Sequence, residues 1–317
     1  MNILLTGSIA FDYLMTFPGQ FKDHILLERL ERLSLSFLVD SLERQRGGIA
    51  ANIAYSMALL GAKPSIMATA GKDFAEYGEW LNKHGVDTSP IKIYPELYTA
   101  SFFVSTDQTN AQIASFYSGA MAKASELSFH NLDSKPDLAM ISANEPNAME
   151  RYIDECVELG IPFAYDPSQQ TVRLEAEPLR KGLTHCESLF VNDYEFELIR
   201  EKTGLTIETI LENSDYIVIT KGEHGASVYF EDTALDIPAA EPNQIVDPTG
   251  VGDAFRAGFM RGYLADLSLE RCAQMGSIAA SFCLEKQGPQ GHSFDLSEFT
   301  ERFRQHFDDQ GELDQLA

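Results

Sequence analysis

DPTGVGDAF, residues 247–255, combines two glycines with an acidic residue at each side of the turn they form. Gly250 and Gly252 allow successive backbone N–H groups to face one point, and the small residues that follow predict the start of a helix. Such a turn binds a phosphate group through its amides. A phosphate-binding loop of the GxxxxGK[ST] type has a lysine, whereas this turn ends in Asp253. The stretch therefore predicts an anion-binding turn at the start of a helix, with a carboxylate beside it.

Asp253 has two interpretations. A carboxylate beside an anion hole accepts the proton of an attacking hydroxyl group while amides stabilise the transferring phosphoryl group, which is the chemistry of a small-molecule kinase. Acidic side chains are also common at helix N-termini, where they satisfy backbone N–H groups without any catalytic role. These nine residues alone leave both interpretations open.

The composition restricts the classes of ligand. The chain has 317 residues, with 48 acidic and 24 basic side chains, and its net charge is -24. Its 44% hydrophobic and 23% charged residues are typical of a globular protein. The negative charge repels nucleic acids and anionic membranes, so we expect neither as a partner. A phosphate ligand therefore needs local neutralisation by amides, cationic side chains or a metal.

The cysteines and the N-terminus indicate a cytoplasmic protein. The N-terminal stretch MNILLTGSIAFDYL has no basic region and reaches Asp12 before a long apolar run develops, so we expect no signal peptide and no membrane span. The four cysteines lack the CxxC spacing of a zinc or redox site and are expected to be reduced core thiols: Cys156, Cys186, Cys272 and Cys283.

Short apolar runs alternate with helix-length segments along the chain. Apolar strands that alternate with helices predict a mostly parallel sheet covered by helices on both faces. A ligand then binds outside the carboxyl ends of the strands. The expected helices include 50–62 and 148–160, and the expected strands are 2–8, 64–71, 137–143, 162–167, 188–193, 215–222 and 226–232.

Two stretches do not fit this alternation. Residues 32–43 and 99–117 have strand propensity, and turn residues at 107–110 predict a hairpin in the second. We expect them to form a small β-sheet lid over the main sheet. The expected division is a large α/β nucleotide-binding domain of residues 1–12, 44–96 and 119–317, and a small lid of residues 13–43 and 97–118.

Four motifs together resemble the signatures of the ribokinase-like (PfkB) family of carbohydrate and nucleoside kinases. They are RGGIAANIA (46–54), NDYE (192–195), TKGEHGA (220–226) and DPTGVGDAFRAGF (247–259). The resemblance implies the ribokinase-like fold and an ATP-dependent phosphotransferase with an alcohol-group acceptor. It also implies that Asp253 is the catalytic base and that the anion hole consists of Gly250, Val251 and Gly252. Pro248 and Val251 depart from the family pattern but leave the required amides and carboxylate in place.

Further stretches resemble the actinobacterial type of adenosine kinase, among them 7–21, 33–40, 111–121 and 165–170. This resemblance implies that adenosine is phosphorylated at its 5′-hydroxyl by ATP, giving AMP and ADP in purine salvage. A kinase for another nucleoside, or for a sugar such as ribose, is the alternative. A catalytically silent binding or regulatory protein is a third reading, but such a protein is expected to have lost Asp253 or Glu195.

A nucleoside needs a ribose site and a base site. We expect Asp12 to accept hydrogen bonds from two neighbouring ribose hydroxyls, and Gly48 and Asn52 to contact the sugar. Phe102 and Phe116 are expected to sandwich the base, which requires both on one face of the hairpin. An odd-numbered loop, such as 106–110, or a bulge satisfies that requirement. The expected polar contacts to the base are Ser8, Ser36, Gln169 and Gln170.

The family resemblance also implies an ATP site and its cation. Glu195 is expected to organise Mg²⁺, most simply through water. The resemblance further implies a homodimer through the lid, and it leaves open whether a monovalent cation such as K⁺ binds near residues 247–250. The residues expected to contact ATP are Asn192, Thr220, Gly222, Gly225 and Gly252.

Overall fold

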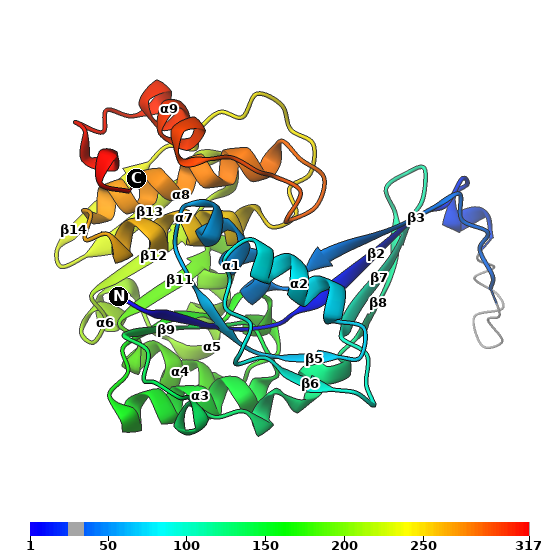
Figure 1. The fold of residues 1–317 in the computed structure, drawn as a ribbon, viewed down its shortest axis with the longest axis horizontal. Coiled ribbons are helices and arrows are strands. Elements are labelled where there is room, and N and C mark those ends of the chain that lie inside the picture. The colour runs from blue at the N-terminus through cyan, green and yellow to red at the C-terminus, as the bar shows by residue number, and fades with distance from the viewer. Residues whose placement is uncertain (25–34, 317) are drawn as a thin grey trace.

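The computed structural model describes residues 1–24 and 35–316, and its centre is an eight-stranded sheet (Figure 1). Six of these strands are parallel, and the last two, β13 and β14, are antiparallel to their neighbours. The strands in spatial order are β14 (Thr233–Ile237), β13 (Ala226–Phe230), β12 (Tyr216–Thr220), β11 (Ser188–Asn192), β10 (Phe163–Asp166), β9 (Leu138–Ser142), β1 (Ile3–Thr6) and β4 (Ser65–Met67).

Helices cover both faces of this sheet because successive strand residues point to opposite sides. In β1, Ile3 and Leu5 pack in one core cluster, and Leu4 packs in the other. The first cluster contains residues of α1 (Ile49–Leu59), α2 (Ala75–Lys83), α7 (Val251–Leu264) and α8 (Leu269–Leu284). The second contains residues of α3 (Pro146–Leu159), α4 (Ala176–His185), α5 (Asp193–Thr203) and α6 (Ile207–Leu211). Figure 1 shows α3 and α4 on the side of the sheet opposite to α7 and α8. The predicted fold class is confirmed.

The C-terminal part of the chain packs on the outer side of α8. Helix α9 (Leu296–His306) contributes Phe299 and Phe303 to a third core cluster, which also includes Leu313 and Leu316 from the last turn. Helix α3 ends at Gly160, whose φ of 60° is left-handed, as the sequence predicts. Within residues 1–24 and 35–316, no helix has the length and apolar character needed to cross a membrane.

The expected strand 64–71 is instead two strands that belong to different sheets. β4 pairs with β1, whereas β5 (Thr69–Gly71) pairs with β6 (Lys92–Tyr94). The run is buried nearly throughout, so its apolar pattern gives no sign of the break. A Cβ atom at Gly71 would overlap the backbone at Tyr98, and glycine permits that close approach. Strand β14 was not predicted because most of its side chains are exposed.

A separate four-stranded sheet projects from the large sheet (Figure 1). Its spatial order is β3 (Ser41–Gly47), β2 (Ala10–Thr16), β7 (Ala100–Thr106) and β8 (Gln112–Tyr117), and we call it the small sheet. The predicted strand at 32–43 is wrong in position. Residues 35–40 lack strand structure, residues 32–34 lie outside the described part, and β3 begins at Ser41. The sequence of β3, SLERQRG, is mostly polar because it is an edge strand, which hides its strand character.

The hairpin of the small sheet has an odd-numbered loop, as predicted. Thr106 pairs with Gln112, which leaves a five-residue loop at 107–111, one position later than expected. Phe102 therefore lies directly opposite Phe116 on the same face. The carboxylate of Asp107 holds the loop by accepting hydrogen bonds from the backbone and hydroxyl of Thr109 and from the N–H groups of Ala111 and Phe21.

Asp12 lies inside the second strand of the chain. It belongs to β2, and its neighbours across the small sheet are Gln45 on β3 and Phe102 on β7. The strands β2 and β3 thus extend beyond the segments 13–43 and 97–118 expected for the lid. This placement fixes Asp12 on the same face as the two phenylalanines.

Candidate active site

A cavity of about 430 Å³ lies between the small sheet and the carboxyl-terminal edge of the large sheet. Its lining comes from β2, the start of α1, the β7–β8 hairpin, the segment after β10, and α7. The structure brings together here most of the residues expected to bind the acceptor: Ser8, Asp12, Gly48, Asn52, Phe102, Phe116, Gln169, Gln170 and Asp253.

Ser36 is not among the residues that line this cavity. It is exposed on the segment before β3. The neighbouring Phe37 packs against Phe17 and Phe21, with ring centroids 5.0 Å apart in each case. This aromatic cluster anchors the segment at the outer part of the small sheet, and the structure does not bring Ser36 to the candidate site.

Two consecutive glycines allow β3 and α1 to approach Asp12. Gly48 has a φ of 94°, and a Cβ atom there would lie 2.6 Å from the carbonyl oxygen of Ser8. A Cβ atom at Gly47 would lie 2.6 Å from Oδ2 of Asp12. The hydroxyl oxygen of Ser8 accepts a hydrogen bond of 3.2 Å from the N–H of Ile49, the first residue of α1. Ser8 therefore helps to place the helix that carries Asn52.

The carboxylate of Asp12 accepts no hydrogen bond from the part of the chain that the structure describes. Burial, together with the negative charges of Asp247 and Asp253, raises the pKa of Asp12 to about 6. A partly buried carboxylate with free acceptor positions suits a ligand that offers two hydroxyl groups.

Asp253 is the third residue of α7 and faces Asn52. Its Oδ2 atom accepts a hydrogen bond of 2.8 Å from Nδ2 of Asn52, and within residues 1–24 and 35–316 its Oδ1 atom has no partner. Burial raises the pKa of Asp253 to about 6, while Arg256 and the hydrogen bond from Asn52 oppose the rise. A carboxylate that lines the cavity, with a raised pKa and one oxygen without a partner in the described chain, has the properties that a general base requires.

The glycine-rich turn has the conformation that an anion hole needs. Gly250 has a left-handed φ of 80°, and a Cβ atom there would overlap Pro289. The N–H groups of Gly252 and Asp253 have no acceptor among the described residues, because they precede the first internal hydrogen bonds of α7. These free amides, together with the positive end of the helix dipole, are chemically suited to an anion next to the carboxylate of Asp253.

Arg256 is the principal site residue that the sequence reasoning missed. Its Nη2 atom donates a hydrogen bond of 2.7 Å to Oδ1 of Asp166, whose side chain is fully buried at the end of β10. A Cβ atom at Gly252 would lie 2.9 Å from Nη1 of Arg256, so the guanidinium lies directly against the turn. A buried cation therefore lies next to the turn, although the turn itself has no lysine. Arg256 follows Asp253 by three positions, which places both on one face of α7. That spacing is the feature of the sequence that could have indicated a role for Arg256 beside Asp253.

Asn192 and Glu195 lie outside this cavity, at the carboxyl end of β11. They form a capping box: Oδ1 of Asn192 accepts from the N–H of Glu195, and Oε2 of Glu195 accepts from the N–H of Asn192. Oε1 of Glu195 has no hydrogen bond within the described chain. The donor set thus offers one free carboxylate oxygen, which fits a metal bound through water rather than a resident metal. The described residues contain no cluster of three or more His, Cys, Asp or Glu side chains arranged to hold a metal.

The other residues expected at the ATP site follow β12. Thr220 is the last residue of β12 and pairs with Asn192 across the sheet. Gly222 and Gly225 both have left-handed φ angles, 57° and 86°, and a Cβ atom at Gly225 would overlap the backbone of Ile237. The turn after β12 and the capping box therefore share the edge of the large sheet, beyond the acceptor cavity.

The lining of the cavity also includes Gln170 and Arg173. Nε2 of Gln170 donates to the carbonyl oxygen of Asn144 at 2.7 Å, but its Oε1 is buried and has no partner in the described chain. Arg173, which the sequence reasoning missed, also lines the cavity. Its position just after a short helical turn gives no sequence pattern that would single it out.

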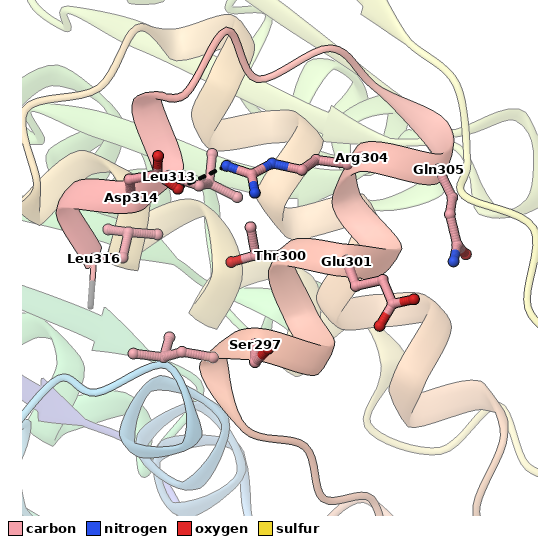
Figure 2. Close-up of a pocket in the computed structure, with 9 residues that line it drawn as sticks. Ser297, Thr300, Glu301, Arg304, Gln305, Leu313, Asp314 and Leu316 are labelled. Carbon is pink, nitrogen blue, oxygen red and sulfur yellow. Dashed lines mark hydrogen bonds and ion pairs between the residues drawn. The ribbon is translucent and has the colours of Figure 1, made fainter.

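A second hollow, of about 620 Å³, is lined only by residues 296–316 and shares no lining residue with the acceptor cavity. Figure 2 shows it between α9 and the C-terminal turn, with Arg304 directed toward Asp314. Arg304 is already paired with Asp309 at 2.9 Å and Asp314 at 2.7 Å. None of the signature motifs contributes to this hollow, so its larger volume does not make it the candidate site.

Comparison with known proteins decides the family. The model of the pfkB family of carbohydrate kinases matches residues 10–295. The chain belongs to the PfkB family. This PfkB kinase is 31% identical over 307 residues to a nucleoside kinase of Methanothermobacter thermautotrophicus, covering 95% of each chain. It is also 28% identical over 312 residues to a nucleoside kinase of Methanocaldococcus jannaschii, covering 96% of this chain and 97% of the relative.

Solved structures confirm the ribokinase-like fold of this PfkB kinase. A nucleoside kinase of Burkholderia thailandensis in complex with inosine superimposes with a TM-score of 0.86 at 32% identity, covering 96% of this chain and 98% of that one. The structure of the Methanocaldococcus jannaschii nucleoside kinase, an archaeal member of the ribokinase family, gives a TM-score of 0.87 at 27% identity, covering 96% and 99% of the two chains. The predicted family is therefore confirmed.

Proposed function

We propose that this PfkB kinase transfers the terminal phosphoryl group of ATP to the 5′-hydroxyl of a nucleoside, with adenosine among its acceptors. One observation carries the proposal: a single cavity joins Asp12, Asn52 and Asp253 to two phenylalanines that are neighbours on one face of the hairpin. Two aromatic rings on one face of a hairpin suit a flat base, whereas a plain sugar would leave them without a partner. The nucleoside kinases among the relatives support the same acceptor class.

In the proposed reaction, Asp12 accepts hydrogen bonds from the ribose hydroxyls and holds the sugar against Gly48. Asp253 accepts the proton of the 5′-hydroxyl through its free oxygen as that hydroxyl attacks the phosphoryl group. The amides of Gly252 and Asp253 stabilise the charge on the transferring group. We take the small sheet as a lid that closes over the nucleoside and excludes water, which prevents hydrolysis of ATP.

ATP is proposed to bind along Asn192, Thr220, Gly222 and Gly225, with its reacting phosphate at the turn that contains Gly252. Mg²⁺ bound with ATP would neutralise the phosphate charges, and the free carboxylate oxygen of Glu195 would hold it through water. The carboxylate of Asp247 accepts from the N–H groups of Thr249 and Gly288 and from the side chain of Gln287. These donors satisfy it, so the proposal gives Asp247 a structural role and includes no monovalent cation.

The acceptor class is tested by following ADP release with saturating Mg-ATP and a panel of adenosine, inosine, guanosine, cytidine and ribose. We expect adenosine and at least one further nucleoside to be phosphorylated with a kcat/KM about 10²-fold or more above that of ribose, because only a base fills the aromatic end of the cavity. A higher kcat/KM for ribose than for every nucleoside would overturn the proposal.

Nucleoside binding is expected to weaken in acid. Asp12 must be ionised to accept from both ribose hydroxyls, and its pKa in the free protein is raised to about 6. The dissociation constant should therefore be constant above pH 7 and rise about tenfold per pH unit below 6. Calorimetric titration without ATP checks this, since Asp253 need not be ionised for binding. Asp12→Asn should bind more weakly and lose the pH dependence, and an unchanged pH dependence in that variant would exclude Asp12 as its source.

We also propose that the protein is cytoplasmic and that it forms a homodimer through the small sheet. β8 is an edge strand whose side chains are all exposed, among them Ile113, Phe116 and Tyr117. An edge with free backbone groups and apolar side chains is suited to pairing with a second copy. Sedimentation equilibrium is expected to give a dimer for the wild type and a monomer for Ile113→Lys, and a monomeric wild type would exclude this assembly.

A further inference from the structure

A continuous chain of buried hydrogen bonds runs from the end of β3 to Asp253. The hydroxyl of Tyr77 on α2 donates to the carbonyl oxygen of Gly47 at 2.9 Å. Nε2 of Gln290, on the segment after α8, donates both to the hydroxyl oxygen of Tyr77 and to Oδ1 of Asn52, the latter at 2.9 Å. Nδ2 of Asn52 then donates to Asp253. The three intermediate side chains are at most 8% exposed.

The direction of every bond in this chain follows from its first member. A backbone carbonyl is only an acceptor, so the hydroxyl proton of Tyr77 must point to Gly47. The oxygen of Tyr77 is then left as an acceptor, which selects the NH₂ group of Gln290 as its neighbour. The NH₂ group of Gln290 is also a donor to Asn52, so the atom of Asn52 that faces it must be the acceptor Oδ1. The NH₂ group of Asn52 then points toward the carboxylate of Asp253.

We propose that Tyr77 and Gln290 are positioning residues that fix the amide of Asn52 with its donor side toward Asp253. The inference rests on the proposed function, because it concerns the base of that reaction. With the donor side inward, Oδ2 of Asp253 is occupied and Oδ1 alone is left for the acceptor hydroxyl. With the amide reversed, an oxygen would face the carboxylate and repel it.

A purely structural role for these side chains would not require this arrangement. The carboxylate of Asp253 is an acceptor and by itself favours the NH₂ end of the Asn52 amide. Gln290, which is held by Tyr77, presents a donor to Oδ1 at the opposite end of that amide, so the same orientation is fixed from both sides. Tyr77 reaches Asp253 only by way of Gln290 and Asn52, so its effect on catalysis must depend on Gln290.

The test is a double-mutant cycle on kcat with Tyr77→Phe, Gln290→Met and the double variant, using adenosine and Mg-ATP. We expect kcat to fall about 3- to 10-fold for Tyr77→Phe and about 10- to 100-fold for Gln290→Met, with the KM for ATP within about twofold. Tyr77→Phe should cause no further loss in the Gln290→Met background, because the hydrogen-bond chain to Asp253 is already broken.

Tyr55→Phe is the matched control. The hydroxyl of Tyr55 donates to the carbonyl oxygen of His292 at 2.7 Å, and it is buried but takes no part in the hydrogen-bond chain to Asp253.

Tyr55→Phe is expected to lower thermal stability as much as Tyr77→Phe and to leave kcat within about twofold of the wild type. Losses that multiply in the double variant, or an equal kcat for the two Tyr→Phe variants, would overturn the proposal. If Gln290→Met does not fold, the comparison of the two Tyr→Phe variants decides by itself. A wild-type protein that phosphorylates no nucleoside would instead refute the proposed function, and the two failures are thereby distinguished.

Discussion

The Asp253→Asn variant is expected to lose about 10²- to 10⁴-fold in kcat while keeping its affinity for the nucleoside within about threefold. The amide keeps the shape of the side chain but cannot accept the proton of the attacking hydroxyl. Removal of a negative charge beside the anion-binding turn does not weaken ATP binding. Steady-state kinetics with adenosine, together with calorimetric titration of the nucleoside, measure the two quantities separately.

Asp266→Asn is a suitable control for this experiment. Asp266 is exposed in the turn after α7, and its φ of 59° is one that asparagine also adopts readily. Its kcat should equal that of the wild type. An Asp253→Asn variant with at least half of the wild-type kcat would show that the carboxylate of Asp253 is not the base, and would return it to the role of a helix-capping acid.

The Arg256→Met variant is expected to lose about 3–5 kcal/mol of folding free energy, because it leaves the carboxylate of Asp166 buried without its ion-pair partner. The two side chains are 7% and 0% exposed and are joined at 2.7 Å. Burial raises the pKa of Asp166 to about 7 even with the guanidinium present. Denaturant unfolding at pH 7.5 measures the loss.

Arg256→Met is also expected to lower kcat, because the guanidinium opposes the rise in the pKa of Asp253 and neutralises charge next to Gly252. The double variant Asp166→Leu, Arg256→Met separates the two effects. It should recover most of the lost stability, since an apolar pair replaces a buried ion pair, but it should not recover kcat. Recovery of both quantities would mean that Arg256 serves only to neutralise Asp166.

The sheet, its helices and the position of the hairpin were accessible from the sequence, because each depends on patterns within short segments. The parity argument on Phe102 and Phe116 gave the odd loop, since side-chain direction alternates strictly along a strand. The division of 64–71 between two sheets was not accessible, because pairing partners lie far apart in the chain. β3 was misplaced because an edge strand with polar side chains has little apolar pattern.

The same distinction applies to the site. Asp12, Asn52 and Asp253 belong to recognisable motifs, and the structure brings them together. Arg256 and Gln290 were missed because their roles depend on contacts with residues that are far away in sequence: Asp166 in the first case and Asn52 with Tyr77 in the second. The guanidinium of Arg256 is one of the cationic side chains that the net charge called for near a phosphate, but the sequence did not indicate which residue supplies it.

The position of the new phosphate on the product is the most direct test of the account. Wild-type protein, adenosine and Mg-ATP are incubated to completion, and the products are identified by ³¹P and ¹H NMR. Binding of the ribose hydroxyls by Asp12 and activation of the remaining hydroxyl by Asp253 predict AMP phosphorylated only at the 5′ position, in equal amount to ADP. A 2′- or 3′-phosphate, or ADP formed together with free phosphate and unchanged adenosine, would contradict it.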